Sequence, residues 1–385
     1  TSIEVTFTQV VDSLSLTTNT VDSNCSGSLQ LSSDEFVTCV QMTAEPSLDG
    51  QQTTVTITPT ETLTEALVYK LKVTADVKNS KSENLPLYEM AKGFTVNNTF
   101  AGGVQDGLLS LEKRLTTIAG GVGEAGGKDG IGSTPKISSP KGMAFDGSSL
   151  YLADSIDHVI RKFNFNTGKW SVLAGRLGEA GSNNGVGDSA RFDTPVALAV
   201  GASRVFLYIA DQGNRLIRKV TLTTKEVQTI SIANNPFEVL SGLALLQNDL
   251  YITDIAQHTL SKLNLSSLQL TTVVGQKKTI GSDDATTGSS SRLNRPTDVV
   301  VIGQTLYITD SGSHRVRKVE PINNYKTSTL VGQNGQPGQT DGLPAQALLD
   351  SPLAISGNTS FLYVVDRSHR VRKINLQNNN VTTII

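Results

Sequence analysis

The chain has few of the residues that redox and metal sites require, and it lacks long apolar segments. Among its 385 residues there are two cysteines, one tryptophan and four histidines, and aromatic residues make up only 5%. Neither a CxxC motif nor a histidine near the cysteines is present, which argues against a zinc or redox site. No stretch approaches the ~18 consecutive apolar residues of a membrane-spanning helix. With 33 Lys+Arg against 35 Asp+Glu, the chain lacks the basic excess typical of nucleic-acid binders, so we expect no nucleic-acid partner.

Composition changes abruptly near residue 98. Residues 1–98 contain 28 Ser+Thr but only three glycines, and their 12 acids and 5 lysines give a net charge of −7. The rest of the chain has a net charge of +5 and 31 of the 34 glycines. Such a change marks a domain boundary, and we expect domains at 1–98 and 99–385.

The first domain consists of short alternating segments rich in β-branched residues. They show no helical period and lie at 2–10, 36–43, 53–60, 66–77 and 93–96. This pattern is typical of an antiparallel β-sandwich. The segments EVTFTQVVD (4–12), TVTITPTETL (54–63) and YKLKV (69–73) resemble a bacterial Ig-like family of surface and S-layer proteins. The resemblance implies a spacer or adhesive module without a catalytic site.

Cys25 and Cys39 both lie in this domain, 14 residues apart. In an oxidising compartment they would form a disulfide, which contributes about 3 kcal/mol in the loop-entropy model. Two unpaired buried thiols are the alternative. The chain begins at Thr1 without an export signal, and we expect a trimmed extracytoplasmic protein whose signal, with any lipid anchor, lay upstream. We therefore expect the disulfide.

From residue 140 a unit of four short strands recurs five times. Its second strand ends in Asp, and its third carries an Arg-Lys pair in most copies. The second strands are YLAD (151–154), YIAD (208–211), YITD (251–254), YITD (307–310) and YVVD (363–366). The arginines are Arg161, Arg218, Arg317 and Arg372. Four strands joined by short turns make one propeller blade, so the chain as a whole is expected to be all-β.

Long Gly-rich loops precede four of the five units. They span residues 120–140, 175–195, 275–296 and 332–352. The repeated marks resemble the NHL repeat, and these loops resemble those of its bacterial extracellular branch. The resemblance implies an NHL-type β-propeller behind an Ig-like domain, as in bacterial surface lipoproteins, spirochaete proteins included. The third copy departs from the pattern, because Leu240 replaces the proline, Ser261 replaces the arginine, and the long loop is missing.

The number of blades is left open by the repeats. The segment RLTTIAG (114–120) looks like a further fourth strand before the first copy. We favour a sixth blade assembled from residues 99–120, including DGLLSLEKRL (106–115), which would close the ring. A five-bladed ring with that strand as an edge cover is the alternative.

The histidines and the repeated aspartates suit structural roles better than chemical ones. His158, His258, His314 and His369 occupy equivalent positions in different blades and so cannot converge on one metal. We expect them to bond local backbone or the preceding Asp. The Asp at the end of each second strand is expected to be a turn acceptor.

The four long loops and the turns after each Asp should share one face of the propeller. Long loops in compact folds are often functional, so this rim is the predicted ligand site. Its candidate residues are Asp129, Asp188, Arg191, Asp283, Asp284, Arg292 and Asp341. The acids suggest calcium, but their spacing is unlike a DxDxDG loop, and we expect no cofactor. In the channel, Asp298 is the one acid among small residues of the first strands, where it could bind a cation or a polar ligand.

Two classes of function follow. The favoured one is a non-enzymatic binding or adhesion protein of the bacterial cell surface, outer membrane or periplasm. Its loop-rich face would contact a protein or glycan, such as a host-matrix or envelope component, with the Ig-like domain as spacer. The alternative is a metal-dependent lyase, because some propellers of similar repeats are amidating or streptogramin lyases. A sensor domain of a larger protein is a third possibility.

Overall fold

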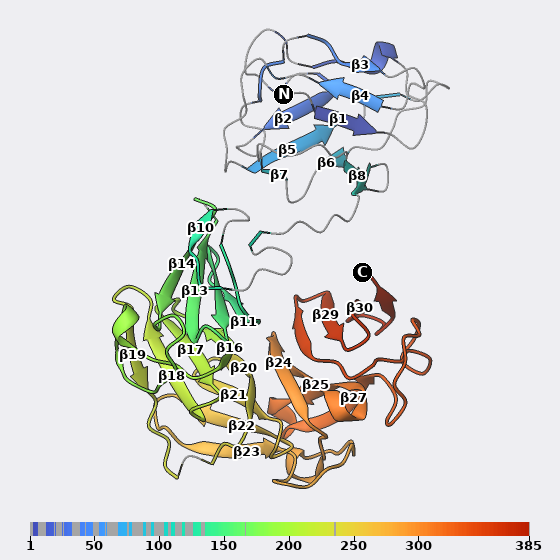
Figure 1. Cartoon of the computed structure of the whole chain (residues 1–385). Coiled ribbons are helices and arrows are strands. Elements are labelled where there is room, and N and C mark those ends of the chain that lie inside the picture. Colours follow the sequence, from blue (N-terminus) through green and yellow to red (C-terminus); the bar gives the residue numbers. More distant parts are fainter. Residues whose placement is uncertain are drawn as a thin grey trace. The chain divides into compact units, whose positions relative to one another are not determined.

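In the computed structural model the chain separates into two compact units, residues 1–116 and 117–385 (Figure 1). The structure describes residues 135–165, 167–234 and 236–384, together with 118–119, 126–131 and short segments between residues 3 and 111. The described secondary structure is β-strands and short 3-10 turns.

The first unit is built from two β-sheets. One sheet has the order β3 (Ser47–Leu48), β4 (Thr54–Ile57), β1 (Ile3–Thr6), β8 (Val104–Asp106) and β9 (Leu109–Leu111). The other contains β2 (Leu29–Ser32), β5 (Val68–Val73), β6 (Tyr88–Glu89) and β7 (Phe94–Thr95), and a short turn η1 (Ser13–Ser15) lies outside both. Alternate residues of β2 and β4 form the core, with Leu29, Leu31, Val55 and Ile57 at most 1% exposed. The predicted β-sandwich is confirmed.

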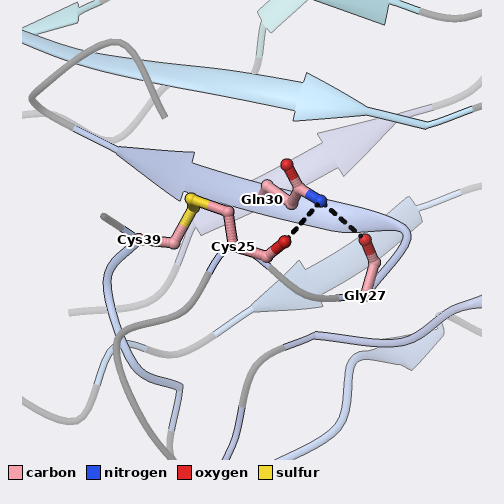
Figure 2. Close-up of a disulfide and its surroundings, with 4 residues drawn as sticks. All are labelled: Cys25, Gly27, Gln30 and Cys39. Carbon is pink, nitrogen blue, oxygen red and sulfur yellow. Dashed lines mark hydrogen bonds between the residues drawn. A yellow bond between two sulfur atoms is a disulfide. The ribbon is translucent and has the colours of Figure 1, made fainter. Parts of the chain in front are cut away.

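The predicted disulfide between Cys25 and Cys39 is present, with the two Cα atoms 4.9 Å apart (Figure 2). The side chain of Gln30 braces the chain beside it, because its Nε2 donates to the carbonyl oxygens of Cys25 and Gly27 at 3.3 and 3.1 Å. Gly27 has a φ of +85°, and a Cβ there would lie 2.7 Å from the carbonyl oxygen of Thr17. The turn that carries Cys25 therefore requires glycine.

The second unit contains five antiparallel four-stranded blades. Blade 1 consists of β11 (Pro140–Phe145), β12 (Ser149–Asp154), β13 (Val159–Asn164) and β14 (Lys169–Ala174). Blade 2 consists of β16 (Pro195–Val200), β17 (Phe206–Asp211), β18 (Leu216–Thr221) and β19 (Glu226–Thr229). Blade 3 consists of β20 (Leu240–Leu246), β21 (Asp249–Asp254), β22 (Thr259–Asn264) and β23 (Leu270–Val274). Blade 4 consists of β24 (Pro296–Ile302), β25 (Thr305–Asp310), β26 (Arg315–Glu320) and β27 (Lys326–Val331). Blade 5 consists of β28 (Ala354–Gly357), β29 (Phe361–Asp366), β30 (Arg370–Asn375) and β31 (Val381–Thr383).

Neighbouring blades pack face to face through the period-2 alternation of their strands. The first strands contact one another in the order β11, β16, β20, β24 and β28. In blade 2, Leu207 and Ile209 pack against blade 1, whereas Tyr208 and Ala210 point the other way and pack against blade 3. The predicted propeller architecture is therefore confirmed with five blades (Figure 1).

The expected sixth blade from residues 99–120 is not seen among the residues that the structure describes. Strands β8 and β9 were expected to contribute to it, but β8 pairs with β1 in the first unit and β9 pairs with β8. Of the segment 114–120 the structure describes Ile118 and Ala119. Ala119 packs on the face of blade 1 opposite to blade 2, and Trp170 Nε1 donates to the carbonyl oxygen of Ile118 at 3.3 Å. These two residues cover only part of that face, since Phe145 remains 57% exposed.

Candidate functional site

The four long loops, which we call the arms, return to the outer edge of the blade that follows them. In the first arm, β10 (Gly130–Ile131) pairs with β14, and in the second, β15 (Gly185–Val186) pairs with β19. The third and fourth arms make single bridges, Ala285 to Thr327 and Gly342 to Val381. Short turns follow in two arms, η2 (Gly187–Ser189) and η3 (Gly288–Ser290). Each arm is therefore an additional edge segment of its blade rather than a free loop.

A buried arginine on the third strand holds each arm in place. In blade 4, Arg317 is fully buried, and its Nη1 donates to Asp310 Oδ2 at 2.9 Å and to the carbonyl oxygen of Arg292 at 3.1 Å. Its Nη2 donates to the carbonyl oxygen of Asp283 at 3.0 Å and to the carboxylate of Asp284. Asp284 in turn accepts the backbone N–H of Thr329 on the fourth strand at 2.9 Å. We call this set of contacts the arginine clamp.

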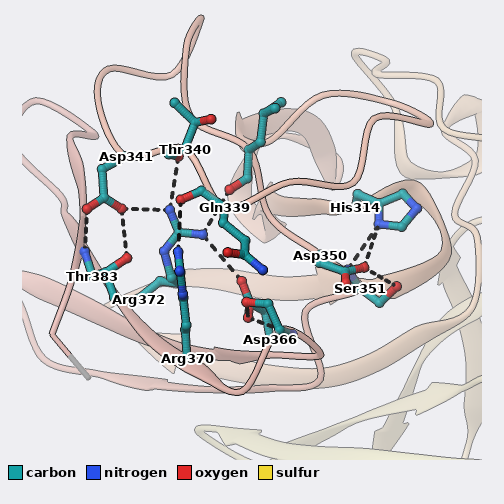
Figure 3. A network of polar contacts seen from close by, with 12 residues as sticks. His314, Gln339, Thr340, Asp341, Asp350, Ser351, Asp366, Arg370, Arg372 and Thr383 are labelled. Atoms are coloured by element: carbon teal, nitrogen blue, oxygen red, sulfur yellow. Dashed lines mark hydrogen bonds and ion pairs between the residues drawn. The ribbon is translucent and has the colours of Figure 1, made fainter.

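The clamp is repeated in blade 5 (Figure 3). Arg372 donates to Asp366 at 3.3 Å, to the carbonyl oxygen of Thr340 at 3.0 Å and to Asp341 at 2.7 Å. Asp341 accepts the N–H of Thr383 at 2.8 Å. Partial burial raises the pKa of Asp341, but the hydrogen bonds from Thr383 and Arg372 outweigh it and hold the pKa below its usual value.

Blades 1 and 2 vary the same arrangement. In blade 2, Asn184 replaces the arm acid and accepts from Arg218 Nη2 at 3.1 Å, while Asp211 pairs with Nη1 at 2.9 Å. In blade 1, Arg161 contacts three acids, which are Asp129, Asp154 and Asp157. Burial raises the pKa of Asp211 against the opposing effect of its hydrogen bonds and of the arginine. The sequence signal for the clamp was the Arg six or seven residues after the Asp in four of the five repeats, but it did not reveal the arm residue that completes it.

The predicted rim residues fall into three groups. Asp129, Asp284 and Asp341 are bound by the clamp arginines and are 43%, 46% and 44% exposed. Arg191 and Arg292 brace their own arms, through Glu179 and the carbonyl of Asp188 in one case and the carbonyls of Ser289 and Ser291 in the other. The carboxylates of Asp188 and Asp283 remain exposed.

The histidines connect one blade to the next. The Nδ1 atoms of His158, His258 and His314 accept the backbone N–H of a residue that lies one to three positions before the next blade's first strand. These donors are Thr194 at 3.1 Å, Arg295 at 3.1 Å and Ser351 at 3.0 Å. The structural role that we expected is present, although the partner lies in the next blade rather than in the local turn. An accepting Nδ1 requires a neutral imidazole.

The surroundings of these three histidines differ. The Nδ1 atom of His158 lies 3.6 Å from Oδ1 of Asp193, and Nδ1 of His314 lies 3.7 Å from Oδ1 of Asp350. At the junction of blades 3 and 4 the equivalent residue is Asn294, which has no charge. Burial lowers the pKa of His258, and the nearby Arg295 lowers it further against weaker opposing effects of Asp310 and Asp254.

Asp298 joins the first strands of blades 4 and 5. Its two carboxyl oxygens accept the N–H groups of Val299 and Ile355, each at 2.9 Å. The residue as a whole is partly exposed, but its carboxyl group is surrounded by protein, and this burial raises its pKa to about 7. The carboxylate predicted to line the channel is thus bonded to backbone across a blade junction.

The geometry defines an all-β protein that combines a β-sandwich with a five-bladed propeller. Residues 1–96 match the family model of the bacterial Ig-like domain. The chain is 24% identical over 307 residues to human NHL repeat-containing protein 2, covering 67% of this chain and 42% of that protein. It thus spans less than half the length of this relative. The chain therefore carries a bacterial Ig-like domain at its N terminus and an NHL-repeat β-propeller after it.

Two solved structures are similar to this chain at low sequence identity. An auxiliary nutrient binding protein from Bacteroides thetaiotaomicron is 14% identical with a TM-score of 0.52, covering 92% of this chain and 78% of that chain. A streptogramin B lyase is 12% identical with a TM-score of 0.44, covering 64% of this chain and 68% of that chain. At this identity the first similarity shows a shared fold and nothing further.

Two further findings apply to the part of the chain that the structure describes. No helix there is long and apolar enough to cross a membrane. No three His, Cys, Asp or Glu side chains come together there in a way that could hold a metal ion. The disulfide, together with the bacterial Ig-like domain, points to a protein outside the cytoplasm, because disulfides persist in oxidising compartments.

Proposed function

We propose that this protein is a non-enzymatic, extracytoplasmic binding protein of the bacterial cell surface or periplasm. In this proposal the arm-bearing face of the propeller contacts a protein or glycan ligand, and the Ig-like domain acts as a spacer. The observation that carries the proposal is the clamp. It fixes the root of each arm with a buried arginine, while the tips at residues 176–180, 276–280 and 333–337 lie at the surface.

Two of these tips rest on the turns of the preceding blades. Gly178 N–H donates to the carbonyl oxygen of Asp157, and Lys278 N–H donates to that of Gln257, each at 3.0 Å. The tips differ in charge and size: one carries Arg176 and Leu177, another Lys277 and Lys278. A fixed root with a variable tip is the arrangement that scaffolded binding loops use. The lyase alternative would need histidines and acids free for chemistry, whereas the blade histidines His158, His258 and His314 are used between blades.

A binding screen tests the proposal. The full chain would be applied to a glycan array and to a panel of immobilised extracellular-matrix and envelope components. Any ligand found would be retested with one variant in which Arg176 and Leu177 are replaced by Ser, and with a second in which Lys277 and Lys278 are replaced by Ser. We expect at least a tenfold loss of affinity in one of them with unchanged thermal stability. Full affinity in both, and in a matching variant of residues 333–337, would show that the ligand binds elsewhere.

A further inference from the structure

Blade 3 is the exception to the arm arrangement, and it lacks both halves of the clamp. Ser261 stands where the other blades have arginine, and it pairs in register with Thr272 as Arg317 pairs with Thr329. No arm precedes this blade. Its sheet ends at β23, and among the described residues no segment pairs with the outer edge of that strand. Unpaired edge strands are natural sites for strand addition.

The acid of the clamp is nevertheless retained in blade 3. Asp254 is 3% exposed and accepts four backbone N–H groups at 2.8 to 3.2 Å, from Glu238, Val239, Ala256 and Gln257. In the other four blades the equivalent carboxylate lies 2.8 to 3.3 Å from a guanidinium nitrogen. Asp254 makes no ion pair with any residue that the structure describes. A buried carboxylate therefore lacks the cation that its counterparts have.

A second acceptor at this place has no donor. Gln257 is only 7% exposed, and its Oε1 is buried without a hydrogen-bond partner among the described residues. It lies three residues after Asp254, as Asp157 lies three residues after Asp154, and Asp157 accepts from Arg161 Nη2 at 3.0 Å. A buried acceptor without a donor is destabilising, and a ligand that supplies the donor would recover that loss. Blade 3 thus keeps the acceptors of the clamp without its guanidinium.

We propose that the outer edge of blade 3 binds an extended segment of a partner protein that carries an arginine side chain. The segment's backbone pairs with β23 as the arms pair with the fourth strands of the other blades. Its guanidinium enters the space left by the small Ser261 side chain and donates to Asp254 and to Gln257 Oε1. Arginine fits because its planar group can bond two acceptors at once, as Arg218 and Arg317 do in their own blades. The site is separate from the arm tip at residues 176–180, which rests on blade 1.

A peptide copied from the protein's own second arm provides the probe. A fluorescein-labelled peptide of residues 181–190 carrying Asn184→Arg is titrated into the full chain, and the unsubstituted peptide serves as the control. Asn184 is chosen because it is the arm residue that meets the clamp arginine in blade 2. We expect the Arg peptide to bind at least tenfold more tightly and to slow hydrogen exchange at Thr271, Thr272 and Val273.

Two variants of the protein test the position of the site. Ser261→Arg places a guanidinium there from within the blade and is expected to abolish binding, whereas Ser266→Arg, an exposed substitution on the same blade, should leave it intact. Asp254→Asn gives a second test if Ser261→Arg does not fold, with an expected loss of at least tenfold. Equal affinity of the two peptides for the wild-type chain, or unchanged binding of the Arg peptide to Ser261→Arg, would overturn the proposal. So would a calcium-induced rise in Tm that Asp254→Asn removes, because the place would then be a metal site. The variant in which Arg176 and Leu177 are replaced by Ser should bind the peptide normally, which separates this site from the proposed ligand face.

Discussion

Replacing Arg317 by Met is the most direct test of the clamp. Methionine keeps an unbranched chain of similar length but removes the charge and the donors to Asp310, Asp284 and two arm carbonyls. Both Arg317 and Asp310 have fully buried side chains, so the change leaves a buried carboxylate without its cation. Losing one partner of a buried pair costs about 3–5 kcal/mol. Asp284 is 46% exposed, and its pairing adds at most about 1 kcal/mol.

The expected result is a loss of about 3–5 kcal/mol in urea unfolding of the full chain, with a fall in the propeller's Tm of roughly 6–20 °C. Hydrogen exchange should accelerate throughout residues 275–296, because the arm loses its anchor. Asp284→Ala is the matched control and should cost about 1 kcal/mol. The double variant Arg317→Met with Asp310→Leu should recover most of the loss, since no buried charge is left unpaired. A loss below 1 kcal/mol for Arg317→Met, or one equal to that of Asp284→Ala, would refute the reasoning.

Three further predictions concern the disulfide and the blade junctions. Reducing the bond between Cys25 and Cys39 should cost the first unit about 3 kcal/mol, seen as a lower Tm of its transition in calorimetry with reductant and no change in the propeller transition. Because the pKa of His258 is lowered in the folded protein, its contribution to stability is present above the unfolded pKa of about 6.5 and is lost as pH falls through the folded pKa. In a series of Tm measured against pH, His258→Gln should remove this loss of stability at acid pH. An unchanged series would contradict the prediction. The pKa of Asp298, raised to about 7, acts in the opposite sense: its contribution to stability is present below the unfolded pKa of about 3.9 and is lost as pH rises through 7. Asp298→Asn should flatten this decline of Tm with rising pH. The carboxyl ¹³C chemical shift of Asp298 in the wild type should titrate near pH 7.

Much of the fold could be predicted because its determinants are local. Period-2 alternation, the Asp at the end of the second strand and the turn signals lie within each repeat, so the blades follow from short segments. The disulfide was predictable because both cysteines lie in one small domain. The destination of residues 104–111 was not, because the pairing of β8 with β1 joins segments about a hundred residues apart and has no local signal.

The candidate site was harder to predict, since its carboxylates are shared between elements. Asp129, Asp284 and Asp341 look like free loop acids in the sequence, and only the folded arm brings them to Arg161, Arg317 and Arg372. A sequence signal that links the arm to the arginine is the coincidence in the third repeat, where the arginine and the arm are absent together. An arm needs the arginine as its anchor, and a buried arginine needs the arm's oxygens to satisfy its donors.

This mutual dependence explains why the propeller can vary its arm tips. The Nη1 of Arg372 donates to the carboxylate of Asp366 and to the carbonyl oxygen of Leu348. Its Nη2 donates to the carbonyl oxygen of Thr340 and to the carboxylate of Asp341, so three of these four contacts hold the root of the fourth arm. None of these lies in the tip at residues 333–337. Substitutions in a tip therefore leave the anchoring energy unchanged, whereas a substitution at the root exposes a buried charge. Blade 3 shows the converse: without an arm, Asp254 is satisfied by backbone alone, and the edge of β23 is the one fourth-strand edge that the described chain leaves for another molecule.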